Sequence, residues 1–445
     1  MLLRGENLDK NEIIRILNDW NFWEKEQETG FFRHDYISRL EALMTTGQIA
    51  VVTGPRRAGK SFIMRQMAKK LITGGTNPKD ILIVNLEDPR FTLAGTALLE
   101  EIFEAFMERV STGKVPVLFL DEIQEIDRFE KWVLMMKDLG KAKIVISGSN
   151  AKLLSRELGT LLAGRHLDMT VFPLSFAEFL EFNGCGPQVE THEQERRAKG
   201  LLIKYIKEGS FPEVVLSAAK KELLLSYYED VVNKDVLRRY RIRKPQDLRA
   251  AVKYLFSNVS SLFTFNSMDR SLGMSITSAR NYTGYMEQAY LLFSLKRFSY
   301  KLREQEKSPR KIYAIDTGLC NAAGFRFSDN YGRLAENAVF LSIKRRQNVN
   351  PESELYYWKD ELHREADFVL KGEKGIQKII QVCWNMNDMK TRKREIHSLS
   401  LAMQDLKCGN AEIISGEEEG EEEISGVKIK VTPLWKWLLA ARTGD

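Results

Sequence analysis

One eight-residue stretch constrains the fold of this chain more than any other. Residues 54–61 read Gly-Pro-Arg-Arg-Ala-Gly-Lys-Ser, which matches the pattern G-x-x-x-x-G-K-[ST] at every fixed position. A β-rich apolar run at 49–53 precedes it, and the residues from Phe62 onward have a helical pattern. In such a strand–loop–helix unit, backbone N–H groups turn inward and hold phosphates at the helix N-terminus. The sequence therefore predicts a nucleotide-binding P-loop in an α/β fold.

The side chains of this loop have expected roles in binding ATP and Mg²⁺, the two cofactors that the motif implies. Lys60 is expected to pair with the β- and γ-phosphates, and the Ser61 hydroxyl is expected to ligate Mg²⁺. We predict that the whole stretch contacts the nucleotide: Gly54, Pro55, Arg56, Arg57, Ala58, Gly59, Lys60, Ser61 and Phe62.

A second apolar run, residues 115–120, ends in Asp121 and Glu122. A continuous apolar run is typical of a parallel strand that is buried on both faces. Ligands of open α/β sheets bind at the carboxyl ends of the strands, where these two acids emerge. We expect Asp121 to hold Mg²⁺ through water and Glu122 to be the base that polarises the attacking water. An Asp-Glu pair favours hydrolysis over simple nucleotide binding.

Further along the chain, polar residues are candidates for contact with the γ-phosphate. The strand-like residues 143–146 are followed by Ser-Gly-Ser-Asn, in which Ser149 or Asn150 would act as the sensor, although this sequence also suits an ordinary turn. Arg165 is the candidate arginine finger, acting in cis or on a neighbouring subunit of a homo-oligomer. Arg156 competes for this role, and a surface or partner-binding arginine is the alternative for Arg165.

Taken in order, these motifs resemble those of a group of AAA-type ATPases common in archaea and bacteria. The resemblance covers nearly the whole chain and rests on residues 53–61, 120–124, 147–149, 163–165, 173–180, 209–213 and 228–235. It implies an ATPase core with a helical lid and a DNA-binding winged helix. It also implies a C-terminal α/β domain of unknown function that resembles the restriction-endonuclease (PD-(D/E)xK) fold.

The length of 445 residues leaves room for several such domains. We predict an N-terminal helical linker at 1–45, the P-loop ATPase core at 46–175, the helical lid at 176–247, the winged helix at 248–316 and the PD-(D/E)xK-like domain at 317–445. Trp20 and Trp23 of the linker are expected to pack on the ATPase core.

The segment 250–286 predicts a helix-turn-helix on its own terms. Helical patterns at 250–258 and 266–272 are followed by a break at Gly273 and by a further helix that Ser275 caps. On this last helix we expect four side chains to face solvent and contact DNA: Ser278, Arg280, Asn281 and Thr283. Two strand-like runs, 291–297 and 310–315, flank a basic loop that is a candidate wing. The alternative is a helix-turn-helix that only packs against protein.

The last third of the chain has an incomplete nuclease pattern. Glu336 on a predicted helix and Asp367 on a predicted strand match two of the acids that hold Mg²⁺ in PD-(D/E)xK enzymes. At the third position, Gln381 stands where the Glu of Glu-x-Lys is expected, and Cys383 replaces the lysine. Lys378 and Lys390 are candidates to supply that lysine. We expect a binding or scaffold role here, with an ATP-regulated DNA nuclease as the alternative.

Composition and charge narrow the class of protein further. No apolar run approaches the ~20 residues of a membrane-spanning helix, residues 1–20 lack the apolar region of a secretory signal, and the four cysteines lie far apart. We therefore expect a cytoplasmic protein without a membrane partner. Basic residues cluster at 238–244 and 296–311 and favour DNA as the partner, although an adaptor that binds protein instead remains open. The acidic run 417–423 is expected to be an exposed hairpin loop.

Overall fold

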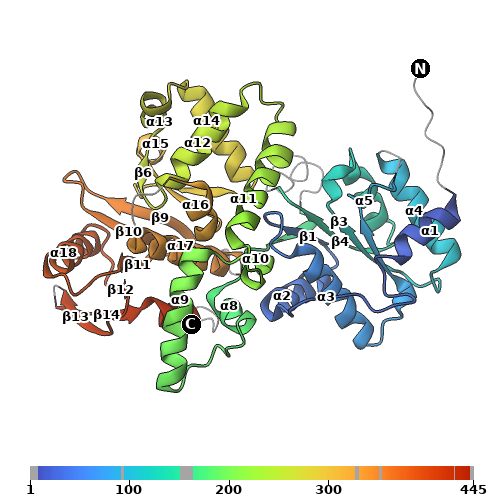
Figure 1. Cartoon of the computed structure of the whole chain (residues 1–445), viewed down its shortest axis with the longest axis horizontal. Helices are drawn as coiled ribbons and strands as arrows, with labels where there is room; N and C mark the ends of the chain where they lie inside the picture. Colours follow the sequence, from blue (N-terminus) through green and yellow to red (C-terminus); the bar gives the residue numbers. More distant parts are fainter. Residues whose placement is uncertain are drawn as a thin grey trace. The chain divides into compact units, whose positions relative to one another are not determined.

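The computed structural model describes residues 9–91, 95–150, 164–325, 330–349, 353–424 and 426–440. The chain divides into two units, Met1–Val171 and Phe172–Asp445, and each has its own apolar cores (Figure 1). Within the described residues, no helix combines the length and the apolar character needed to cross a membrane.

The first unit is built on a parallel sheet of five strands. These are β1 (Ile49–Thr53), β2 (Ile81–Asn85), β3 (Val117–Asp121), β4 (Lys143–Gly148) and β5 (His166–Thr170), in the order β2-β3-β4-β1-β5. Strands β1, β2 and β3 consist mostly of buried apolar residues because helices cover both faces of the sheet. The predicted α/β core with a parallel sheet is confirmed.

Alternate residues of β1 to β4 enter different cores. Val51 packs in a core with α1 (Lys10–Asn18), α4 (Thr96–Arg109) and α5 (Phe129–Asp138). Its neighbour Val52 packs in a second core with α2 (His34–Thr45) and α3 (Lys60–Thr73). Side chains of a strand point alternately to its two faces, so the two helix groups lie on opposite faces of the sheet (Figure 1).

The N-terminal segment packs on this sheet as predicted. The indole Nε1 of Trp23 donates to the carbonyl oxygen of Ile81 at 2.9 Å, and the ring stacks on Phe106 with centroids 5.7 Å apart. Trp20 donates to a carboxylate oxygen of Asp88 at 2.9 Å. The linker residues are therefore part of the first unit.

The second unit begins with a run of helices. They are α8 (Phe176–Phe182), α9 (His192–Glu208), α10 (Pro212–Leu216), α11 (Lys220–Asp230), a π-helical segment (Val231–Arg238) and α12 (Pro245–Ser257). Capping boxes begin two of them, with Ser175 and Glu178 at α8 and Thr191 and Gln194 at α9.

A small antiparallel sheet follows α12. Its strands β6 (Leu262–Phe263), β7 (Leu292–Leu295) and β8 (Arg310–Ala314) have the order β6-β8-β7. Between β6 and β7 lie α13 (Phe265–Leu272) and α14 (Ile276–Gln288), and α15 (Leu302–Lys307) lies between β7 and β8. Gly273 ends α13 in the left-handed region, and Ser275 caps α14 by accepting from the Ser278 backbone.

The predicted exposure of the α14 side chains is partly wrong. Arg280 and Asn281 are exposed and Ser278 is half-buried. Thr283 is buried, and its hydroxyl donates to the carbonyl oxygen of Ala279 at 2.8 Å. Thr283 lies four residues after the buried Ala279, so it shares the inward face of the helix.

The chain ends in a six-stranded mixed sheet. Its strands are β9 (Glu354–Lys359), β10 (Glu365–Gly372), β11 (Gly375–Cys383), β12 (Ala411–Ser415), β13 (Gly420–Ile424) and β14 (Val427–Pro433), in the order β13-β14-β12-β11-β10-β9. Helices α16 (Thr317–Ala323), α17 (Tyr331–Val349), α18 (Met389–Asp405) and α19 (Leu434–Ala440) accompany it. One apolar core extends from Phe172 through the small sheet to Leu438, so these segments fold together.

The prediction that the acidic run at 417–423 is a hairpin loop is wrong in part, because some of these residues form a strand. Residues from Gly420 onward belong to β13, which pairs antiparallel with β14. Glu421 lies opposite Lys430 and Glu423 lies opposite Lys428 in this register. Opposite charges across the pair stabilise a strand that a run of like charges alone would not favour.

Candidate functional site

The P-loop connects β1 to α3 and folds around the side chain of Lys60. Gly54 has φ 138° and Gly59 has φ 100°, both in the region that favours glycine. A Cβ atom on Gly54 would lie 2.1 Å from the carbonyl oxygen of Val171, so a larger residue does not fit. The Lys60 ammonium donates to the carbonyl oxygens of Gly54 at 3.0 Å and Pro55 at 3.1 Å.

Both predicted acids meet the P-loop at the carboxyl end of β3. Asp121 ends the strand, and Glu122 follows in the left-handed region with φ 53°. One carboxylate oxygen of Glu122 lies 3.5 Å from the Lys60 nitrogen, and a hydrogen bond joins Asp121 to Ser61. The structure therefore brings together the four side chains that the sequence assigned to phosphate, Mg²⁺ and water.

The two adjacent carboxyl groups have different acidities. Burial raises the pKa of Asp121, and the charge of Glu122 raises it further. Burial also acts to raise the pKa of Glu122, but the charges of Lys60 and Arg56 outweigh it and hold that pKa below its ordinary value. Glu122 is therefore ionised at neutral pH, as a base that receives a proton from water must be.

Sequence reasoning missed Ser147 and Gln124, which position these acids. The Ser147 hydroxyl donates to Asp121 and accepts from the backbone N–H of Glu122 at 3.1 Å. The Gln124 amide donates to Glu122 and lies 3.5 Å from the Ser149 hydroxyl. Ser147 directly follows the apolar run of β4, and this buried polar residue near the end of the strand was the available signal.

The predicted sensor residues follow directly after β4. Ser149 and Asn150 are both buried. Ser149 lies within reach of Gln124, which also contacts Glu122. Their role as sensors of the γ-phosphate stays a prediction.

Other residues around the loop have visible partners. Arg56 forms an ion pair with Glu87 at 2.8 Å, and Arg57 is exposed with φ 67°. The Arg33 guanidinium donates to the carbonyl oxygen of Ala58 at 2.9 Å. The exposed Phe62 ring lies against Gly30. The segment before α2 therefore contacts the P-loop.

Arg165 lies at the wrong end of the sheet to act in cis. Its carbonyl oxygen accepts from the backbone of Ile49 at 3.1 Å, at the start of β1, whereas the P-loop follows the end of that strand. Its guanidinium forms an ion pair with Asp138 at 2.7 Å. The length of β1 separates Arg165 from Lys60, so the prediction of a finger in cis is wrong. Arg156 lies outside the described residues.

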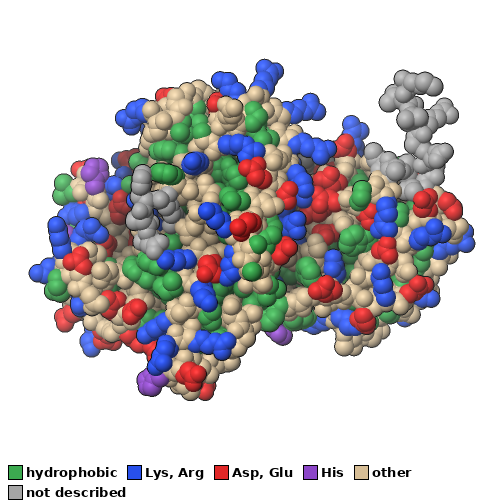
Figure 2. All heavy atoms as spheres, viewed as in Figure 1, with side chains coloured by type: hydrophobic (Ala, Val, Ile, Leu, Met, Phe, Trp, Pro, Cys, Tyr) green, Lys and Arg blue, Asp and Glu red, His purple; other side chains and the backbone are tan. Residues whose placement is uncertain are grey.

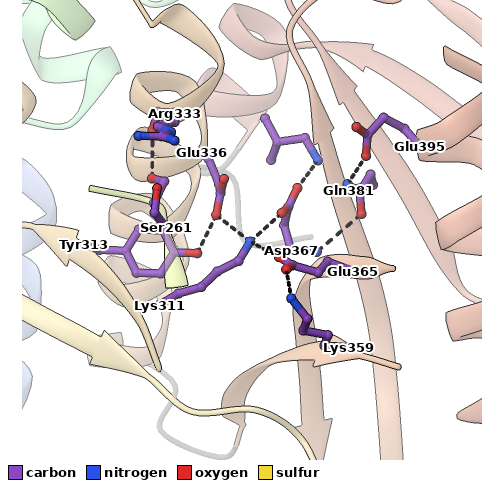
Figure 3. A network of polar contacts seen from close by, with 12 residues as sticks. Ser261, Lys311, Tyr313, Arg333, Glu336, Lys359, Glu365, Asp367, Gln381 and Glu395 are labelled. Atoms are coloured by element: carbon purple, nitrogen blue, oxygen red, sulfur yellow. Dashed lines mark hydrogen bonds and ion pairs between the residues drawn. The ribbon is translucent and has the colours of Figure 1, made fainter. Parts of the chain in front are cut away.

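The three predicted nuclease-like residues also come together, in the second unit. Glu336 of α17 and Asp367 of β10 both bond to the same lysine, and Gln381 of β11 accepts from the Asp367 backbone at 3.3 Å (Figure 3). That lysine is Lys311 of β8, which sequence reasoning did not propose.

The two lysines that it did propose lie elsewhere. Lys378 pairs with Glu412 at 2.9 Å, and Lys390 is exposed at the start of α18. Among the described residues, no group of three or more His, Cys, Asp or Glu side chains is placed to hold a metal ion.

Comparisons with known proteins agree with the prediction of an AAA-type ATPase domain. A model described as an AAA domain matches residues 46–180, and two models described as domains of unknown function, DUF8612 and DUF4143, match residues 199–330 and 331–437. "Uncharacterized protein MJ1544" of Methanocaldococcus jannaschii is 35% identical over 418 residues, which are 90% of each chain. An uncharacterized protein of Haemophilus influenzae is 29% identical over 71% of this chain and 78% of its own.

Solved structures give a more distant likeness. The Walker-type ATPase paby2304 of Pyrococcus abyssi aligns with 68% of this chain and 99% of its own, with a TM-score of 0.42 and 13% identity.

Proposed function

The chain belongs to the family of the M. jannaschii protein, and we propose that it is an Mg²⁺-dependent ATP hydrolase of the AAA type that couples its nucleotide state to DNA binding. The observation that carries the first part is the meeting of Lys60, Asp121 and Glu122 at one edge of a parallel sheet. A phosphate-binding lysine beside a paired Asp-Glu is the arrangement that ATP hydrolysis needs.

The groups present fit ATP together with Mg²⁺. Lys60 rests on two neutral carbonyl oxygens and on one carboxylate at 3.5 Å, so its ammonium can turn to the β- and γ-phosphates. The Ser61 hydroxyl and the Asp121 carboxylate are oxygen donors of the kind that Mg²⁺ prefers. When bound, Mg²⁺ would neutralise charge that develops on the transferring phosphoryl group.

Hydrolysis then depends on side chains that are already oriented. Glu122 receives a proton from the attacking water, and its backbone and its neighbour Asp121 are both fixed by Ser147. Gln124 holds the Glu122 carboxylate and lies beside Ser149, the candidate sensor of the γ-phosphate. Arg165 is half-exposed at the far edge of the sheet, so as a finger it acts on the nucleotide of a neighbouring subunit.

The substitution Glu122→Gln separates binding from turnover. The amide keeps the shape of the side chain but cannot accept the proton, so ATP affinity should be kept while phosphate release falls by at least about 100-fold. Glu125→Gln, at an exposed position in the same turn, is the matched control and should leave the rate unchanged. Unchanged turnover in Glu122→Gln would overturn the assignment of the base.

The DNA-binding part of the proposal rests on the order of elements from α12 to β8. The order is helix, short strand, two helices and two strands in a three-stranded antiparallel sheet, with α15 between the last two strands where a loop was expected. Apart from α15 this is the order of a winged helix, with α14 as its recognition helix. Arg280 and Asn281 of α14 are exposed, as are Arg270 and Lys253 on the two preceding helices. In Figure 2, separate Lys and Arg side chains lie around this part of the surface, with apolar side chains between them.

The charges of the candidate wing favour DNA less strongly than the sequence indicated. Glu306 pairs with Lys296 at 2.5 Å and with Arg310 at 3.1 Å, and Lys311 is buried. By contrast, Arg241 and Arg243 before α12 are exposed. The proposed contact surface therefore consists of α14 and the basic segment before α12 rather than the wing.

A gel-shift titration at several salt concentrations tests DNA binding. The affinity should fall steeply with salt, and Arg280→Ala should lower the slope of log K against log salt by about one unit, because one phosphate contact is lost. Lys374→Ala, in the exposed β10–β11 turn, is the control that should leave the slope unchanged. No shift at low salt would instead indicate an adaptor that binds protein.

We also propose that the sheet from β9 to β14 with α17 and α18 is a restriction-endonuclease-like domain. Its Glu336, Asp367 and Gln381 occupy a helix and two adjacent strands, as the nuclease pattern requires. Whether this domain retains the chemistry of that fold depends on the lysine among its acids.

A further inference from the structure

An ammonium group lies at the centre of the acidic residues of the second unit. Lys311 of β8 donates to Asp367 at 2.7 Å and to Glu336 at 3.0 Å, and its nitrogen lies 3.6 Å from Glu365 (Figure 3). Only 3% of the Lys311 side chain is exposed. The three carboxylates come from α17 and β10, and they converge on a cation from a different sheet.

Each carboxylate has a second donor besides Lys311. Glu336 accepts from the hydroxyl of Tyr313 at 2.6 Å, and Asp367 accepts from the backbone N–H of Val382 at 2.9 Å. Glu365 pairs with Lys359 at 2.6 Å. An ammonium has three N–H donors, and here it faces three carboxylates. Asp367 and Glu365 use their second oxygens for Val382 and Lys359, whereas Tyr313 shares the Glu336 oxygen that Lys311 contacts. Each acid therefore has a protein donor in addition to the ammonium.

We propose that the Lys311 ammonium is the resident cation of this carboxylate site, in the place where a PD-(D/E)xK nuclease would hold a divalent metal. A divalent ion needs to bond the same oxygens at about 2.1 Å, where it would meet the ammonium at close range. Two like charges at that distance repel strongly in a buried site. A metal ion therefore enters only if Lys311 leaves.

The position of Lys311 also argues against the role of a nuclease lysine. Such a lysine stands beside the metal and stabilises charge on the substrate, so it must face the space that DNA enters. Lys311 is instead enclosed by the acids, with its nitrogen 6.0 Å from the centroid of the Tyr357 ring, and it is almost fully buried. The three carboxylates neutralise its charge. Because no lysine is then available to act on a substrate, the site has no nuclease activity.

The same contacts join the small sheet to the C-terminal sheet. Lys311 and Tyr313 alternate along β8 and therefore share one face of it, toward α17. Next to them, the side-chain amide of Asn337 bonds both backbone groups of Ala314, at 2.8 and 3.0 Å. The cation thus has a structural role, because it fixes the candidate winged helix to the nuclease-like sheet.

The test counts Mn²⁺ ions bound to the full chain without nucleotide, by electron paramagnetic resonance. The wild type should bind none at this site. Lys311→Met keeps the length of the side chain but removes the charge, and it should bind one Mn²⁺ that the double variant Lys311→Met/Asp367→Asn loses. Lys359→Met is the matched control, because Lys359 contacts only Glu365 of the three acids and its loss leaves Lys311 in place.

Three results would overturn the proposal. One is a Mn²⁺ ion on the wild type that Asp367→Asn removes, and another is a folded Lys311→Met that binds no Mn²⁺. The third is cleavage of plasmid DNA by the wild type that Asp367→Asn abolishes. If Lys311→Met does not fold, the comparison of the wild type with Asp367→Asn still decides, because absence of Mn²⁺ from both supports the proposal and its loss on substitution contradicts it.

Discussion

Two lysines of this chain lie beside carboxylates, and their surroundings differ. Lys60 rests on two carbonyl oxygens and has one carboxylate at 3.5 Å, at the N-terminus of a helix. Lys311 has carboxylates at 2.7, 3.0 and 3.6 Å and starts no helix. The first ammonium is held loosely by neutral groups and can pair with phosphate. The second is neutralised where it stands, so burial of a lysine among acids does not by itself indicate a catalytic site.

The largest effect is expected from Lys60→Ala. Without the ammonium, the P-loop loses its direct charge contact with the β- and γ-phosphates, and ATP turnover should fall by at least about 1000-fold with a loss of ATP affinity. Phosphate release and nucleotide titration measure the two effects. Lys70→Ala, on the same helix and paired with Glu41, serves as the control and should keep both. Full activity in Lys60→Ala would remove the distinction between the two lysines.

For Lys311→Ala we expect a loss of stability rather than of ATP turnover. The substitution leaves three carboxylates, of which Glu336 and Asp367 are buried, without their shared cation, which costs about 3–5 kcal/mol in the free energy of unfolding. Lys359→Ala should lower the free energy of unfolding by less, because its partner Glu365 still has the Lys311 ammonium nearby. Chemical denaturation followed by circular dichroism measures both. Equal stability of the two variants would show that Lys311 is not the centre of the cluster.

The pH dependence of stability sharpens the same comparison. Burial and the charge of Asp367 raise the pKa of Glu336 to about 7 in the folded chain, against an ordinary value near 4.5. The folded state therefore holds this proton more tightly, and its stabilising contribution is lost as the pH rises from about 4.5 to about 7. Between pH 5 and pH 8, the wild type should lose up to about 3 kcal/mol more than Glu336→Gln, which has no proton to release. Parallel pH profiles of the two proteins would refute this.

A smaller effect is expected from Ser147→Ala at the P-loop site. The Ser147 hydroxyl lowers the pKa of Asp121, so its removal should raise that pKa and move the acidic limb of the turnover profile to higher pH. Loss of one hydrogen bond to each of two catalytic-site groups should reduce turnover by about 10-fold. Ser149→Ala is the comparison that separates positioning from sensing, because the Ser149 hydroxyl lies 3.5 Å from the Gln124 amide, whereas the Ser147 hydroxyl donates to Asp121. An unchanged pH profile in Ser147→Ala would contradict the positioning role.

The contrast between the two lysines also explains what could be predicted from the sequence. The P-loop site is local, because a glycine-rich loop fixes Lys60 and Ser61 and a strand end fixes Asp121. The motifs therefore located the P-loop, both acids and the parallel sheet. The motifs did not predict partners that come from neighbouring strands, such as Ser147. Parallel pairing brings together residues that are distant in the sequence.

The Lys311 cluster could not be located in this way. The nuclease pattern in the sequence grouped Glu336, Asp367 and Gln381, which the structure brings together. The lysines that it suggested, however, lie on or near the strands of these residues. Lys311 comes from β8 of another sheet, and only the packing of α17 against that strand brings it to the acids. The predictions that Thr283 is exposed and that Arg165 is a finger in cis were wrong for a related reason. Which face of a helix is buried, and which end of a strand a residue lies at, both depend on how the elements pack.

One measurement tests the difference between the two sites directly. Mn²⁺ bound to the wild-type chain is counted by electron paramagnetic resonance with and without a non-hydrolysable ATP analogue. We predict one Mn²⁺ per chain with the analogue, absent in Lys60→Ala, and none without it. A Mn²⁺ ion that binds without nucleotide and is lost in Asp367→Asn, or no ion in the presence of the analogue, would contradict this account.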